Sequence, residues 1–208
     1  MNKEELISTI LKEKLIVIIR NKQQEMVPII VDALIDAGIR VLEITSNTPG
    51  FTEEIRSARK RHPEAIIGAG TITDVEKAEL AMSAGAQFLV TPNVQAEVAA
   101  FAAKRNTVLL IGALTPTEIM MASDMGADIV KLFPADNMGI DYMKAVLAPL
   151  DQVPLFAVGG ISNQNAKAWL DAGAKGLGIG GQLTKIDGTD TSSLKAAARE
   201  LKAILAAF

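Results

Sequence analysis

The chain has no cysteine, and His62 is the single histidine among its 208 residues. Without cysteine there are no disulfides, no thiolate nucleophiles and no sulfur-ligated metals. Few of the usual metal ligands remain, so we expect no metal site and no cofactor. A Mg2+ ion held only by carboxylates stays an open alternative.

Aromatic residues and an excess of one charge are also scarce. Trp and Tyr occur once each, and 21 Lys and Arg against 24 Asp and Glu give a formal net charge of -3. With no basic stripe and few stacking side chains, we expect no nucleic-acid partner.

Long apolar runs are missing as well. Residues 1–5 are charged and lead into a short amphipathic stretch, unlike a signal peptide and too short to cross a bilayer. We therefore expect a cytoplasmic protein with no membrane partner. Apolar residues make up 49% of the chain, enough for a sizeable core in one domain over residues 1–208.

The chain does contain a repeated alternation of two patterns. Short β-branched runs recur roughly every 20 to 26 residues, each followed by helical apolar spacing, which is typical of βα units around a parallel sheet. Eight strands are expected, centred on Val17, Leu42, Ile67, Leu89, Leu109, Val130, Phe156 and Leu177. Between helix and strand, the segments 37–39, 84–86, 125–127 and 172–174 each carry a glycine that can close the helix.

Eight such units predict an α/β fold of the (β/α)8 TIM-barrel type. We expect an additional N-terminal helix over residues 1–13 and a last helix over 192–206. An open doubly wound sheet is the alternative, but no GxGxxG motif follows the first strand and the count of eight favours closure.

Lys131 stands inside the apolar run 129–134. Desolvation disfavours the charged form of a lysine and lowers its pKa, which turns the amine into a nucleophile for carbonyl carbons. The ordinary alternative is a lysine at a strand end whose stem lies on apolar neighbours and whose amine reaches water.

Polar or glycine residues end most of the predicted strands, and in a barrel the carboxyl ends of the strands form the working face. Glu43 and Lys131 should face the same axial space, where Glu43 can move protons. The glycine pairs after the last two strands offer N–H groups to a phosphate or carboxylate. The residues expected at this mouth are Arg20, Glu43, Thr45, Gly70, Thr71, Thr91, Pro92, Lys131, Gly159, Gly160, Gly180 and Gly181.

Other conspicuous residues have structural interpretations. His62 is expected on the surface without partners, and Trp169 should pack against the barrel. Met120, Met121 and Met125 follow helical spacing and are interpreted as core filler.

The segments 42–45 (LEIT), 68–71 (GAGT), 114–118 (LTPTE), 131–135 (KLFPA) and 158–161 (VGGI) resemble the bacterial KDPG aldolase family over essentially the whole chain. That family comprises 2-keto-3-deoxy-6-phosphogluconate aldolases, with 4-hydroxy-2-oxoglutarate aldolase activity. The resemblance implies a class I enzyme on a homotrimeric (β/α)8 barrel, cleaving such keto-deoxy sugar acids to pyruvate and an aldehyde. It makes Lys131 the Schiff-base lysine and Glu43 the acid/base, with Thr71 at the pyruvate carboxylate and Arg20 and Phe133 lining the pocket.

Two departures bear on the substrate. Asn47 stands where many members have arginine, and Gly181 stands where a serine usually contacts phosphate. The segment 47–49 (NTP) also resembles the phosphogalactonate branch, as do 91–93 (TPN) and 156–160 (FAVGG). A 2-keto-3-deoxy-6-phosphogalactonate aldolase is therefore an alternative. A phosphate-binding decarboxylase or epimerase and a non-catalytic barrel that binds sugar acids are further ones.

Overall fold

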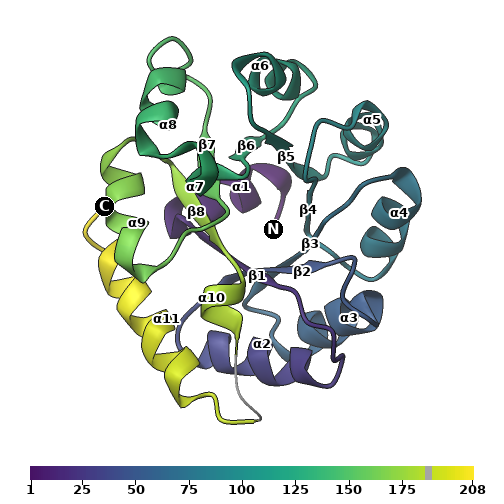
Figure 1. Cartoon of the computed structure of the whole chain (residues 1–208). Helices are drawn as coiled ribbons and strands as arrows, with labels where there is room; N and C mark the ends of the chain where they lie inside the picture. The colour runs from purple at the N-terminus through teal and green to yellow at the C-terminus, as the bar shows by residue number, and fades with distance from the viewer. Residues whose placement is uncertain (186–188) are drawn as a thin grey trace.

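Eight parallel strands close into a barrel in the order in which they follow one another along the chain (Figure 1). This computed structural model describes residues 1–185 and 189–208. The strands are β1 Leu15–Ile19, β2 Val41–Thr45, β3 Ile66–Gly70, β4 Phe88–Val90, β5 Val108–Ala113, β6 Ile129–Leu132, β7 Leu155–Val158 and β8 Gly176–Ile179. Each expected strand centre lies within its strand, so the prediction of a (β/α)8 barrel is confirmed. That residues 1–208 form one domain stays a prediction.

Helices surround the barrel, and α1 lies across one end of it (Figure 1). Their bounds are α1 Lys3–Glu13, α2 Met26–Asp36, α3 Phe51–Arg61, α4 Val75–Ser83, α5 Ala96–Lys104, α6 Pro116–Asp124, α7 Ala135–Met138, α8 Ile140–Leu147, α9 Asn163–Asp171, α10 Gly181–Thr184 and α11 Ser192–Leu205. The expected first and last helices are confirmed. Among the described residues, no helix is long and apolar enough to cross a membrane.

Local sequence signals explain where the helices stop and start. The glycines that follow four of them, Gly38, Gly85, Gly126 and Gly173, all have positive φ, between 83° and 107°. Glycine adopts this left-handed conformation without the steric penalty of a β-carbon. At the start of α6, the Thr115 hydroxyl accepts from the Glu118 N–H while the Glu118 carboxylate accepts from the Thr115 N–H, a complete capping box.

The apolar side chains form two cores. One lies between the outer faces of the strands and the surrounding helices, where Trp169 packs at 1% exposure, as expected. The other fills the barrel interior, and α1 covers its lower end with Leu6 and Ile10 against strand starts such as Ile16 and Ile129. Inward-facing and outward-facing side chains therefore alternate along each strand. Apolar side chains fill the lower layers of the barrel interior, and the layer at the carboxyl ends of the strands holds the polar residues.

Two expectations outside the site are wrong. Met120 and Met121 are 40% and 44% exposed rather than core filler, because they lie on the outer face of α6, whereas Met125 packs partly buried against the core as expected. His62 is half-buried and has a partner, since its Nε2 lies 2.6 Å from the Asp32 carboxylate. Helical spacing alone does not say which face of a helix meets the barrel.

Candidate active site

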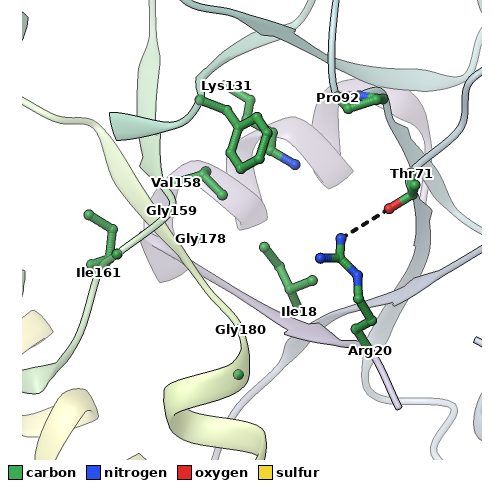
Figure 2. Close-up of a pocket in the computed structure, with 13 residues that line it drawn as sticks. Ile18, Arg20, Thr71, Pro92, Lys131, Val158, Gly159, Ile161, Gly178 and Gly180 are labelled. Carbon is green, nitrogen blue, oxygen red and sulfur yellow. Dashed lines mark hydrogen bonds between the residues drawn. The ribbon is translucent and has the colours of Figure 1, made fainter. Parts of the chain in front are cut away.

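A cavity of about 370 Å3 opens at the carboxyl ends of the strands (Figure 2). It is lined by Ile18, Arg20, Thr71, Pro92, Lys131, Phe133, Val158, Gly159, Gly160, Ile161, Gly178, Gly180 and Gly181. These residues come from strands and loops all around the barrel. In the part of the chain that the structure describes, two basic side chains line the cavity, and the amine of Lys131 and the guanidinium of Arg20 both point into it (Figure 2).

Lys131 projects inward from β6 and is 6% exposed. Burial lowers the pKa of its amine, the Glu43 carboxylate opposes this shift, and the Arg20 charge adds to it. Its Nζ lies 5.0 Å from the centre of the Phe133 ring. A buried amine with a lowered pKa spends more of its time neutral and is then a nucleophile.

Glu43 projects inward from β2 and is 2% exposed. Burial raises the pKa of this carboxyl, while the charges of Lys131 and Arg20 lower it. Among the described residues, its Oε1 has no hydrogen-bond partner. Burial and the neighbouring positive charges thus shift the pKa of this carboxyl in opposite directions. A carboxyl of this kind beside a nucleophilic amine is suited to donating and accepting protons in turn.

Gly70, at the end of β3, makes room for this carboxyl. A β-carbon on Gly70 would overlap the Glu43 carboxylate. Gly70 therefore lets the Glu43 carboxylate approach the backbone of the neighbouring strand closely. Glu43 itself does not line the cavity wall but is buried behind it.

Thr71 follows Gly70 and presents a hydroxyl to the cavity. Arg20 Nη2 donates a hydrogen bond to Thr71 Oγ1 over 3.3 Å (Figure 2). A hydroxyl and a guanidinium placed together can both donate to a carboxylate. This pair is the part of the wall best suited to an anionic end of a ligand.

The opposite wall is built from glycine pairs after β7 and β8. Gly159 and Gly160 have positive φ of 99° and 73°, conformations that favour glycine. A β-carbon on Gly160 would overlap the Asp136 side chain, which lies against this turn from α7. Side chains are absent along this wall at Gly159, Gly160, Gly178, Gly180 and Gly181, so a ligand can approach the backbone closely.

Of the residues expected at the site from sequence, nine line the cavity: Arg20, Thr71, Pro92, Lys131, Phe133, Gly159, Gly160, Gly180 and Gly181. Asn47 does not, because it lies past the end of β2 with its side chain exposed. Thr91 does not either, because its hydroxyl is buried between the Asn93 carbonyl oxygen and the Gly112 N–H.

Ile18 and Val158 also line the cavity, although the strand-end pattern predicts only polar and glycine residues there. Each lies two residues before an expected site residue, Arg20 and Gly160, so strand alternation alone identifies them. The described residues contain no group of three or more His, Cys, Asp and Glu side chains arranged to hold a metal ion.

The chain is similar to known aldolases. The family model described as KDPG and KHG aldolase matches residues 6–198. The 2-dehydro-3-deoxy-6-phosphogalactonate aldolase of Escherichia coli strain K12 is 35% identical over 175 residues, which are 83% of this chain and 85% of the relative. The KHG/KDPG aldolase of the same strain is 36% identical over 155 residues, 74% of this chain and 72% of the relative.

A solved structure shares the architecture. The KDPG aldolase of Legionella pneumophila, with pyruvate captured as a covalent carbinolamine intermediate, superimposes with a TM-score of 0.85 and 25% identity. The match covers 95% of this chain and 97% of that one. With the family model spanning most of the barrel, the chain belongs to the KDPG and KHG aldolase family.

Proposed function

We propose that the protein is a class I aldolase that cleaves 2-keto-3-deoxy-6-phosphogluconate to pyruvate and glyceraldehyde 3-phosphate, with Lys131 as the Schiff-base residue. The same site accepts 4-hydroxy-2-oxoglutarate, which yields pyruvate and glyoxylate. The observation that carries the proposal is a buried amine of lowered pKa, at the wall of the cavity and under the electrostatic influence of Glu43. The carbinolamine captured in the Legionella enzyme supports covalent chemistry of this kind.

The residues act in a defined order. Neutral Lys131 Nζ attacks C2 of the keto acid, and Glu43 supplies the proton with which the carbinolamine loses water. The resulting iminium nitrogen accepts the electron pair of the C3–C4 bond as that bond breaks. The Glu43 carboxylate left by the dehydration step takes the proton of the C4 hydroxyl, and C4 leaves as the carbonyl carbon of the aldehyde. Glu43 then gives this proton to C3 of the enamine, which restores the iminium. Addition of water to the iminium then frees pyruvate and Lys131.

Binding groups at the two ends of the cavity orient the substrate. The Thr71 hydroxyl and the Arg20 guanidinium hold the carboxylate next to C2, where their separation of 3.3 Å lets both reach one anion. The phosphate lies against the backbone of the glycine pairs at 159–160 and 180–181. Without a serine hydroxyl at Gly181, one hydrogen bond to the charged phosphate, worth about 1.5–3 kcal/mol, is absent from this end.

Borohydride trapping tests the covalent step. Incubation with pyruvate and sodium borohydride should add one three-carbon unit to Lys131, located by peptide mass spectrometry. Lys131→Met should give no adduct. Labelling of another lysine, or no labelling of the wild-type protein, would contradict the proposal.

The C4 epimer, 2-keto-3-deoxy-6-phosphogalactonate, is a second candidate substrate. Val158 gives the cavity an apolar wall that offers no side-chain hydrogen bond to a substrate hydroxyl. The Escherichia coli phosphogalactonate aldolase is 35% identical to this chain and the KHG/KDPG aldolase of the same strain 36%, so both substrates are to be tested. Pyruvate release, coupled to lactate dehydrogenase and measured with both epimers and with 4-hydroxy-2-oxoglutarate, ranks the substrates by kcat/KM. Absence of pyruvate release from every substrate would favour a non-catalytic sugar-acid-binding barrel.

We further propose that the protein works in the cytoplasm as a homotrimer. Three large apolar side chains that are exposed outside the cavity support an oligomer: Met120 and Met121 on α6 and Met138 on α7. A subunit interface would bury such side chains. Light scattering should give three times the mass of the 22.0 kDa chain, and a monomer would contradict this part of the proposal.

A further inference from the structure

Thr71 has an unfavourable backbone conformation. Its φ is +57°, in the left-handed region that β-branched residues rarely occupy. A residue stays in this conformation only when its surroundings hold it there, and such residues gather at functional sites. Contacts of the backbone around Thr71 should therefore show what holds it.

Ser46 supplies contacts on one side. It directly follows β2, and its hydroxyl donates a hydrogen bond of 2.7 Å to the carbonyl oxygen of Thr71. Its own N–H donates to the carbonyl oxygen of Gly70 over 2.8 Å. On the other side, the N–H of Ile72 donates to the carbonyl oxygen of Val90 over 3.1 Å. The carbonyl oxygens before and after the Thr71 α-carbon are both tied to Ser46.

We propose that Ser46 is a positioning residue, which holds Thr71 in the left-handed conformation so that its hydroxyl faces the cavity beside Arg20. Ser46 is half-buried and does not line the cavity, so it acts through Thr71. The inference rests on the proposed function in one respect, the binding of the pyruvate carboxylate at Thr71. Loss of this positioning should lower the affinity for pyruvate, because a donor that is already held in place need not be ordered when the ligand binds.

Pyruvate-dependent trapping on Lys131 measures that affinity. In Ser46→Ala, the pyruvate concentration for half-maximal borohydride adduct should rise about three- to tenfold, the range that one neutral hydrogen bond supplies. The adduct yield at saturating pyruvate should stay at the wild-type level, because Lys131 and Glu43 are untouched. Ser46→Thr keeps the hydroxyl and should restore the wild-type concentration.

Thr9→Ala is a matched control. The Thr9 hydroxyl makes the same kind of bond, 2.7 Å to the Glu5 carbonyl oxygen, in α1 at the other end of the barrel. A general loss of stability would shift Tm in both alanine variants. A loss of positioning, in contrast, should raise the half-maximal pyruvate concentration in Ser46→Ala and leave it unchanged in Thr9→Ala.

A double-mutant cycle with Thr71→Val separates positioning from a direct effect. Valine keeps the branched shape and lacks the hydroxyl, so Ser46 would have no donor left to position. Adding Ser46→Ala to Thr71→Val should then leave the half-maximal pyruvate concentration unchanged. Additive effects of the two substitutions would overturn the inference.

A conformational readout keeps the test independent of catalysis. A crystal structure of Ser46→Ala should show Thr71 outside the left-handed region or in more than one conformation. If Thr71 keeps its φ there, Ser46 does not hold it and the inference is wrong. If the wild-type protein forms no adduct while Thr71 does move in Ser46→Ala, the proposed function fails and the positioning role stands.

Discussion

Replacing Gly70 by alanine should disable the site through a single added carbon. Its β-carbon would overlap the Glu43 carboxylate, which must move by about 2 Å to regain ordinary van der Waals contact. The φ of Gly70 lies outside the left-handed region, so the backbone itself accepts alanine. The substitution therefore displaces the acid without replacing it.

The size of the effect follows from that displacement. A misplacement of about 1 Å at a reacting group can reduce the rate about 10²-fold, so we expect kcat/KM to fall by at least that factor, about 2.7 kcal/mol of transition-state stabilisation. The overlap should also lower the free energy of unfolding by about 1–3 kcal/mol. Pyruvate release measures the first quantity and urea unfolding the second.

Gly68→Ala provides the control in the same strand. Its β-carbon would overlap the ring of Phe88 instead of a carboxylate, so it should lower stability and leave kcat/KM near the wild-type value. If Gly70→Ala stays within about threefold of wild-type kcat/KM while losing as much stability as Gly68→Ala, the position of the Glu43 carboxylate has no part in turnover.

Three further predictions concern the same groups. Glu43→Gln should lower kcat by about 10²–10⁴-fold without lowering Tm, because it replaces a buried carboxyl by a neutral group of the same size, and normal turnover would remove Glu43 from the mechanism. Burial lowers the pKa of Lys131, so between that pKa and the ordinary 10.5 the unfolded chain binds the extra proton and the free energy of unfolding rises with pH. Lys131→Met should remove this rise, and an identical pH dependence in denaturant titrations would contradict a buried neutral amine. Dialysis against EDTA should leave pyruvate release unchanged, since the iminium supplies the electron sink; activity lost and restored by a metal ion would contradict a class I mechanism.

The barrel itself is predictable because its signals are local and repeated. Each strand centre is a short apolar run, and the glycines at 38, 85, 126 and 173 mark the helix ends, with the φ values that the pattern predicts. The strand ends at Arg20, Thr71 and Lys131 converge because closure brings all carboxyl ends to one face. These features depend on the period of the sequence and on little else.

What the sequence does not predict depends on how loops turn after the strands. Thr91 and Asn47 stand at or just past strand ends like the cavity residues, yet one is turned to a backbone carbonyl and the other to solvent. The bond from Ser46 to Thr71 joins residues 25 apart through two loops, and no short-range pattern signals it. The raised pKa of Glu43 likewise depends on burial from several strands at once.

Within the described part of the chain, apolar side chains fill the barrel below the cavity and α1 covers that end, so we expect substrate and products to pass through the opening at the carboxyl ends of the strands. With the buried Lys131 as the proposed Schiff-base residue, pyruvate would stay covalently attached during cleavage, so the aldehyde would have to depart first, by the route that the intact sugar acid took inward. Free pyruvate then leaves by that same route and competes with the next substrate molecule for an empty enzyme. Product inhibition by pyruvate should accordingly be competitive, and by the aldehyde noncompetitive.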